Sequence, residues 1–121
     1  MGTEKTLRCA VIGVGRMGRH HARVYAQIDG AELVGVVDGD KQRRDDIVEE
    51  WGGCAYETVE ELIDAGVDAV TIATPTIYHL EAAAPLLERG IACLIEKPLA
   101  PTTEVAAAIA DAADEGDAVL Q

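Results

Sequence analysis

Two groups of residues have the types and spacing that ligand chemistry requires. The first is Gly13-Val14-Gly15-Arg16-Met17-Gly18, which fits the pattern G-x-G-x-x-G and follows a short apolar run. In such a loop the glycines allow a tight turn, close approach of the backbone to a pyrophosphate, and packing of a helix against a sheet. The helix N-terminus then offers free N–H donors to phosphates. This loop predicts a dinucleotide site, and the open alternative is a tight strand-to-helix turn that merely needs glycine.

An acidic residue stands where the ribose of a dinucleotide would lie. Asp38 ends the second apolar run, 20 residues after Gly18, and a carboxylate there accepts hydrogen bonds from the adenosine ribose hydroxyls. The same charge repels a 2′-phosphate, so the sequence favours NAD over NADP. Arg43 and Arg44 are near enough to reach a phosphate, but the surrounding letters DKQRRDD indicate solvated surface charges. Arg16 fits a pyrophosphate contact or an exposed loop position equally well.

The second group follows the fourth and fifth apolar runs. Thr74-Pro75 with His79 comes after the fourth, and Glu96-Lys97-Pro98 comes after the fifth. Strand ends of a parallel sheet meet at one edge, so we expect both segments beside the glycine loop, where the strand order reverses. An ammonium at Lys97 would stabilise the alkoxide that develops as hydride leaves a carbinol, and the Lys97-Pro98 bond is a candidate cis peptide. The simpler alternatives are helix capping for Thr74 and His79, and a surface ion pair for Glu96 and Lys97.

The elements that must position these residues alternate strictly between strand and helix. The predicted strands span residues 7–12, 32–37, 54–56, 69–73 and 92–95, with a sixth starting at 118–121. The predicted helices span residues 17–29, 41–51, 78–89 and 103–115, with a short one between a Thr58/Glu61 capping box and Gly66. Apolar strands joined by helices imply a parallel sheet covered on both faces. The expected fold class is a doubly wound α/β fold (Rossmann fold) of three layers and about six strands.

Composition narrows the function classes. The chain has 121 residues, of which 49% are hydrophobic, and 22 acidic residues oppose 10 basic ones for a net charge of −12. These values indicate one domain with a real core, spanning residues 1–121, and argue against general binding to nucleic acid or to an anionic membrane. Residues 1–6 lack an apolar leader, and there is no apolar run of membrane-spanning length. We therefore expect no membrane association and a cytoplasmic location.

The cysteines and adjacent histidines do not suggest a metal site. Cys9, Cys54 and Cys93 form an odd set without a C-x-x-C pair, and each lies in or next to a predicted strand. We expect buried thiols in a reducing compartment and no metal. His20 and His21 are neighbours on a helix and point to different sides, so they are expected to be surface or packing residues.

On these residues the chain resembles the N-terminal nucleotide-binding domain of the glucose-fructose oxidoreductase, inositol dehydrogenase and MocA (Gfo/Idh/MocA) family. The resemblance covers essentially the whole chain and rests on the glycine loop, Asp38, the Ala73-Thr74-Pro75 segment with His79 and, above all, Glu96-Lys97-Pro98. It implies that Lys97 lies beside the nicotinamide and the substrate as the catalytic residue. It also implies cofactor contacts, namely Thr74, Pro75, His79 and Glu96.

The resemblance further implies a larger C-terminal α+β domain that carries substrate and oligomer contacts, for which residues 1–121 have no counterpart. We expect the chain to bind NAD, to turn over little or nothing alone, and to self-associate or form homo-oligomers through an exposed sheet edge. The complete form is expected to move hydride between a nicotinamide cofactor and a hydroxyl of a sugar, cyclitol or nucleotide sugar. Two alternatives stay open: a non-catalytic dinucleotide-sensing module and a methyltransferase-like adenosyl binder, which would give Glu96-Lys97-Pro98 no role.

Overall fold

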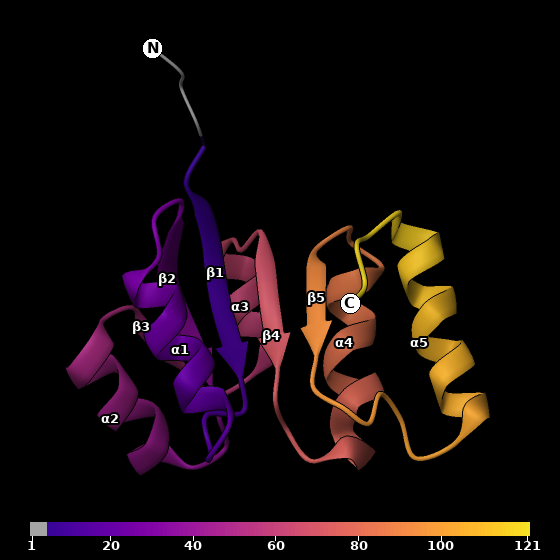
Figure 1. Cartoon of the computed structure of the whole chain (residues 1–121), viewed down its shortest axis with the longest axis horizontal. Coiled ribbons are helices and arrows are strands. Elements are labelled where there is room, and N and C mark those ends of the chain that lie inside the picture. The colour runs from indigo at the N-terminus through magenta and orange to yellow at the C-terminus, as the bar shows by residue number, and fades with distance from the viewer. Residues whose placement is uncertain (1–4) are drawn as a thin grey trace.

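The computed structural model describes residues 5–121, which form one parallel five-stranded sheet with helices on both faces (Figure 1). The strands are β1 (Leu7–Ile12), β2 (Ala31–Val37), β3 (Cys54–Tyr56), β4 (Ala69–Ile72) and β5 (Ala92–Ile95). Their order is β3-β2-β1-β4-β5, and every neighbouring pair is parallel. The order reverses between β1 and β4, so the predicted crevice lies at the carboxyl ends of these two strands.

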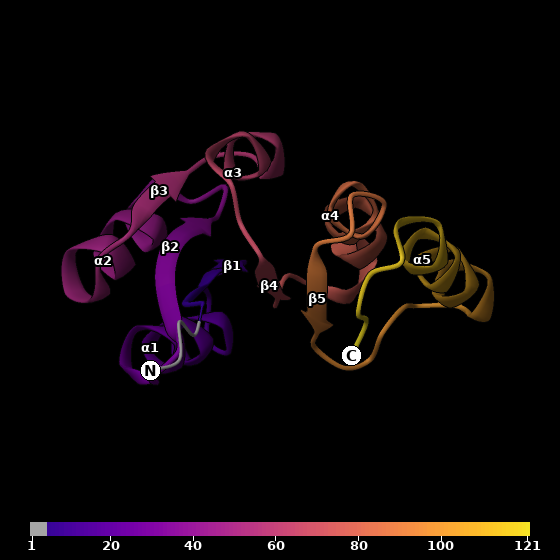
Figure 2. The same cartoon turned by 90° about the horizontal axis from the view of Figure 1, so that it is seen from above.

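The helices divide between the two faces of the sheet. They are α1 (Gly18–Gln27), α2 (Lys41–Trp51), α3 (Val59–Ala65), α4 (His79–Leu87) and α5 (Thr103–Gly116), with a 3₁₀ turn η1 (Thr76–Tyr78) before α4. Seen from above, α3, α4 and α5 lie on one side of the sheet and α1 lies on the other (Figure 2). The doubly wound α/β prediction is confirmed.

Each face of the sheet has its own core. Along β1, alternate side chains point to opposite faces: Ala10 and Ile12 join the core beneath α3, α4 and α5, and Val11 joins the core beneath α1 and α2. Leu62, Leu86 and Leu87 are fully buried in the first core. Burial on both faces is the reason that the strands read as continuous apolar runs.

The ends of the helices follow the sequence closely. Thr58 and Glu61 form the predicted capping box at the start of α3, and Gly66 ends that helix. The helix predicted from residue 78 differs at its start, because the chain first makes the 3₁₀ turn η1 and becomes α-helical at His79. None of the helices within residues 5–121 is both long and apolar enough to cross a bilayer.

Two details of the sheet edges differ from expectation. The sixth strand is present only as a parallel bridge between Leu120 and Cys93, although Gln121 donates its backbone N–H to the Cys93 carbonyl at 3.0 Å. The prediction of three buried thiols is wrong for Cys54, which is exposed, whereas Cys9 and Cys93 are buried. Cys54 lies on β3, a three-residue strand at the edge of the sheet, where no neighbouring strand covers it.

Candidate functional site

The glycine loop joins β1 to α1, and its three glycines have different reasons to be glycine. Gly13 has φ +88°, and a Cβ on it would lie 2.8 Å from the Thr74 backbone nitrogen. A Cβ on Gly18 would lie 1.7 Å from the Gly13 carbonyl oxygen. These two positions are required by the turn itself and by its packing against the segment after β4.

Gly15 is different, because the protein's own packing does not require it. Its backbone is not left-handed, and the nearest atom to a Cβ placed there, apart from its chain neighbours, is Arg43 Nη1 at 3.8 Å. A tight turn alone explains Gly13 and Gly18 but leaves Gly15 without a reason. The space in front of Gly15 is what a ligand would need for close approach to the backbone.

The N-terminus of α1 lacks a side-chain cap, as does that of α4, which continues directly from the turn η1, whereas α2, α3 and α5 each have one. Asp40, Thr58 and Thr102 accept backbone N–H bonds at the starts of α2, α3 and α5. At α1 the capping position is Met17, whose side chain makes no such bond. The backbone N–H groups of Arg19 and His20 donate to the Gly15 and Met17 carbonyl oxygens at 3.2 and 3.1 Å, whereas those of residues 15–18 make no hydrogen bond within residues 5–121. These donors lie beside the positive end of the helix dipole.

Asp38 ties the end of β2 to the glycine loop. Its Oδ2 accepts the Val14 backbone N–H at 2.9 Å, and its Oδ1 accepts the Asp40 N–H at 2.8 Å. Each carboxylate oxygen can accept more than one hydrogen bond. The half-buried carboxylate is therefore fixed in place and still has acceptor capacity toward the cleft.

The prediction that Arg43 and Arg44 are only solvated surface charges is wrong for Arg44. Arg44 Nη1 donates to the Asp38 carbonyl oxygen at 2.9 Å. Arg43 is exposed, but its guanidinium lies beside Gly15 and forms a loose ion pair with Asp40 at 3.9 Å. Arg43 reaches the cleft because α2 begins directly after the turn that follows β2.

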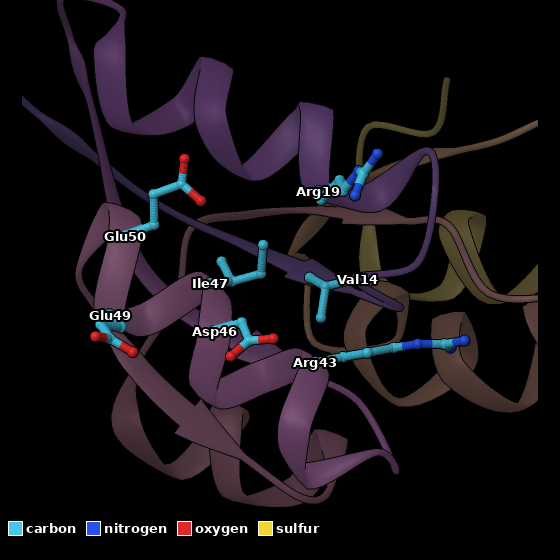
Figure 3. Close-up of a pocket in the computed structure, with 7 residues that line it drawn as sticks. All are labelled: Val14, Arg19, Arg43, Asp46, Ile47, Glu49 and Glu50. Carbon is cyan, nitrogen blue, oxygen red and sulfur yellow. The ribbon is translucent and has the colours of Figure 1, made fainter.

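These elements surround a cavity of about 580 Å³ at the carboxyl ends of β1, β2 and β4. Its polar lining includes Asp38, Arg43 and Thr74, and Arg16, Met17 and Pro75 also line it. A separate cavity of about 650 Å³ lies between α1 and α2 (Figure 3). It contains three acidic side chains and none of the loop glycines, so we take the smaller cavity as the candidate site. Arg43 lines both, and in Figure 3 its side chain extends away from Glu49 and Glu50.

Thr74 and His79 form the wall of the cleft that follows β4. Thr74 Oγ1 is buried and has no hydrogen-bond partner among the described residues. The His79 ring is 1% exposed, with Nδ1 2.9 Å from the Leu99 carbonyl oxygen and Nε2 3.0 Å from the Thr74 carbonyl oxygen. The ring presents no free nitrogen to the cleft and instead joins its wall to the segment after Pro98. No side chain caps η1 or α4, so the capping alternative for Thr74 and His79 is wrong.

Glu96, Lys97 and Pro98 lie at the carboxyl end of β5, outside the lining of the 580 Å³ cavity. The Lys97-Pro98 peptide, a candidate cis bond in the sequence, is cis. Lys97 is exposed and makes no hydrogen bond or ion pair within residues 5–121. The alternative of a Glu96–Lys97 ion pair is wrong, because Glu96 Oε1 lies 2.9 Å from Nε2 of His21.

Within residues 5–121 no group of three or more His, Cys, Asp or Glu side chains is arranged to hold a metal ion. The candidate site is therefore a cleft of glycines, backbone donors and one fixed carboxylate, with a lysine at the neighbouring strand end.

Residues 7–121 match the family described as an oxidoreductase family with an NAD-binding Rossmann fold. The chain belongs to this oxidoreductase family.

Several characterised members of the oxidoreductase family resemble the chain. UDP-N-acetylglucosamine 3-dehydrogenase of Acidithiobacillus ferrooxidans is 42% identical over 94% of this chain and 36% of its own length. The NAD(+)-dependent scyllo-inositol 2-dehydrogenase of Bacillus subtilis is 36% identical over 98% of this chain and 35% of its own length. The crystal structure of GenD2 from gentamicin A biosynthesis, in complex with NAD, superposes with a TM-score of 0.90 at 36% identity over 99% of this chain and 35% of that one. The chain spans about a third of the length of these relatives.

The sequence did not predict the contacts of His21 in this oxidoreductase-family domain. His21 was expected to be a surface or packing residue, yet it contacts both Glu96 and Thr71. Two signals were available. Gly18, Ala22 and Tyr25 mark the inner face of α1, which His21 shares by helical spacing, and Thr71 is a polar residue within an otherwise apolar strand.

Proposed function

We propose that the cleft at the ends of β1, β2 and β4 binds the NAD of a sugar-type dehydrogenase. The observation that carries the proposal is Gly15, where neither backbone conformation nor packing demands glycine and a closely approaching ligand does. The bare N-terminus of α1 supports the same conclusion, because a pyrophosphate satisfies donors that no side chain caps.

The residues present fit the cofactor. The glycine loop and the first turn of α1 hold the pyrophosphate, with Arg16 and Met17 on its open side. Asp38 accepts the ribose hydroxyls, and its negative charge selects NAD over NADP. Thr74, which lines the cleft and whose Oγ1 has no hydrogen-bond partner within residues 5–121, supplies a hydroxyl to the cofactor, and Pro75 packs against it. His79 supports Thr74 from behind, and Glu96 and Lys97 flank the nicotinamide side.

The complete enzyme moves hydride between the cofactor and the carbon that carries a hydroxyl of a sugar, cyclitol or nucleotide sugar. In the oxidising direction the hydroxyl proton passes to solvent as the carbonyl forms. NAD, when bound, supplies the hydride acceptor. The ammonium of Lys97 donates a hydrogen bond to the substrate oxygen and stabilises the negative charge that develops there. The Lys97 side chain is exposed and has no partner among residues 5–121, which leaves its ammonium free for this role. The relatives named for UDP-N-acetylglucosamine and scyllo-inositol support this substrate class.

The proposed domain comprises residues 1–121, and two further proposals concern its surroundings. We infer that the chain pairs with a second copy or with another domain beside β5, because Val119 is 68% exposed there and the bridge of Leu120 leaves the sheet edge open. The free thiols Cys9, Cys54 and Cys93 fit a reducing compartment such as the cytoplasm.

Calorimetric titration of the chain with NAD, NADH, NADP and S-adenosylmethionine in one buffer tests the function. We expect NAD and NADH to bind, NADP to bind at least about tenfold more weakly because of charge repulsion, and S-adenosylmethionine not to bind. Preference for S-adenosylmethionine, or binding of NAD that is unchanged in Asp38→Ala, would contradict the proposal.

A further inference from the structure

Four hydrogen-bonded polar side chains connect α1 with β4 and with the residue that follows β5. Tyr25 Oη lies 2.7 Å from Thr71 Oγ1, Thr71 Oγ1 lies 3.4 Å from His21 Nδ1, and His21 Nε2 lies 2.9 Å from Glu96 Oε1. Thr71 is fully buried, and the His21 and Glu96 side chains are 24% and 27% exposed. The four residues come from three elements, α1, β4 and the end of β5.

With a neutral His21 ring, the hydrogen atoms between these four side chains take one direction. An ionised carboxylate only accepts, so Nε2 of His21 carries the proton that it donates to Glu96. In the neutral ring Nδ1 then accepts, which lets the Thr71 hydroxyl donate to it and leaves Thr71 Oγ1 to accept from Tyr25. Burial raises the pKa of Tyr25 above its usual value, although the bond to Thr71 opposes that rise. Tyr25 therefore keeps its proton and acts as the donor to Thr71.

These four hydrogen-bonded side chains link the glycine loop to the segment that carries Lys97. The helix that carries His21 and Tyr25 begins at the glycine loop, and Glu96 immediately precedes Lys97. With its carboxylate engaged by His21, Glu96 is not paired with the ammonium of its neighbour. Among the described contacts of Glu96, the other anchor is its own backbone N–H, which donates to the Ile72 carbonyl oxygen at 3.0 Å.

We propose that His21 is a positioning residue whose Nε2–H holds the Glu96 carboxylate in place. Because Lys97 follows Glu96 directly, this contact fixes Lys97 relative to α1, the helix that binds the pyrophosphate in the proposed function. The inference rests on the proposed function, in which Lys97 faces the substrate and α1 the cofactor. His21 touches neither the cleft nor Lys97 itself, so it acts through Glu96. The side chain of the neighbouring His20 is exposed and makes no hydrogen bond within residues 5–121, which provides a matched control.

The first test uses the ligand-free chain. A long-range ¹H–¹⁵N spectrum of the imidazoles is expected to show His21 as the Nε2–H tautomer. In Glu96→Gln the His21 cross-peak is expected to shift or to disappear. His21→Phe is expected to shift the amide signals of Glu96 and Lys97 and the side-chain carboxyl ¹³C signal of Glu96. His21→Gln, which retains a donor near the position of Nε2, is expected to restore them, and His20→Phe is expected to leave them unchanged. An Nδ1–H tautomer, or Glu96 signals that His21→Phe does not move, would overturn the proposal.

The second test measures NADH affinity by calorimetry in the same variants, with circular dichroism to show that each is folded. His21→Phe is expected to weaken NADH about threefold to tenfold, the effect of one lost hydrogen bond, and His21→Gln to return to within about twofold of the starting protein. Equal weakening by His20→Phe and His21→Phe, or no recovery in His21→Gln, would overturn the positioning role. Absence of NADH binding in the unaltered chain would instead refute the proposed function, and the ligand-free spectra would still decide the contact.

Discussion

The amino ends of the parallel strands form one edge of the sheet (the amino edge), and their carboxyl ends form the opposite edge (the carboxyl edge). Both edges collect polar groups, but these groups have different partners. At the amino edge, Asp68 accepts the Arg8 backbone N–H at 2.8 Å and the Lys5 ammonium at 3.2 Å, and Arg8 Nε donates to the Gly66 carbonyl at 3.0 Å. At the carboxyl edge, Thr74 Oγ1 has no partner within residues 5–121 and α1 has no side-chain cap. Polar groups that satisfy one another hold the strands together, whereas unused donors and acceptors mark where a ligand binds.

The same comparison explains how an acidic chain can bind a dinucleotide. The net charge of −12 opposes an anionic ligand at long range. In the proposed site at the carboxyl edge, the ligand would meet backbone N–H groups, the positive end of the α1 dipole and the Arg43 guanidinium beside Gly15. Short-range donors in fixed positions outweigh a distant charge that salt screens.

The largest effect is expected from Gly18→Ala, because the added Cβ would lie 1.7 Å from the Gly13 carbonyl oxygen. We expect a loss of about 3 kcal/mol in the free energy of unfolding and no measurable NADH binding. Denaturant unfolding and calorimetry provide the two measurements. Gly39→Ala is the control for the unfolding measurement alone, since a Cβ there has nothing within 4 Å but Gly39 lines the cleft. An equal loss of stability in both variants would show that the loop is not specially packed.

Asp38→Ala is expected to show most clearly that the carboxyl edge and the amino edge differ in their effect on NADH binding. It removes the acceptor for the ribose and the anchor of the Val14 N–H, so NADH should bind about tenfold to a hundredfold more weakly, with discrimination against NADPH reduced. Asp68→Ala is the matched variant at the other edge. It is expected to leave NADH affinity unchanged, and weakening of NADH by Asp68→Ala to the same degree would remove the distinction between the edges.

Asp68→Asn is expected to lower the free energy of unfolding by about 1 kcal/mol at neutral pH. The pKa of Asp68 lies below its usual value, mainly because of the Arg8 backbone N–H and also because of the Lys5 ammonium. A lowered pKa in the folded state means that this contribution is fully present above the ordinary aspartate range and is lost as the pH falls through the folded-state value. Urea unfolding at several pH values should therefore show a difference between the two proteins that shrinks under acid conditions. A difference that grows toward low pH would contradict the assignment.

The smallest perturbation is alkylation of the thiols by iodoacetamide in the native chain. Cys54 should react with iodoacetamide while the protein is folded, whereas Cys9 and Cys93 should react only on unfolding. Burial raises the pKa of both inner thiols, that of Cys93 to about 12, so little thiolate is available. Mass spectrometry of the labelled peptides checks this, and NADH affinity should be unchanged after Cys54 is modified. Early labelling of Cys93 would show that β5 opens locally.

Most of the fold could be predicted from the sequence because its signals are local. The apolar runs predicted the strands to within a residue or two, and Thr58, Glu61 and Gly66 fixed the ends of α3 through capping chemistry that needs no distant partner. The exposure of Cys54 could not be read this way, because it depends on β3 being the edge strand of the sheet.

The candidate site divides along the same line. The glycine loop and Asp38 are recognisable because their spacing is dictated by one strand–turn–helix unit and the following strand. The contact of His21 with Glu96 joins residues that are 75 positions apart, and the ring of His79 meets Leu99 across 20 positions. Such contacts depend on how β4 and β5 lie beside α1, which no local pattern of residues contains.

The most direct test of the account is an NADH titration of the ¹⁵N-labelled chain followed through its backbone amide signals. The account predicts progressive shifts of Val14, Gly15 and Thr74 at the carboxyl edge, with the signals of Arg8 and Asp68 unmoved. Shifts concentrated at Arg8 and Asp68, or confined to the groove between α1 and α2, would contradict the claim that the unused hydrogen-bonding groups at the carboxyl edge form the cofactor site.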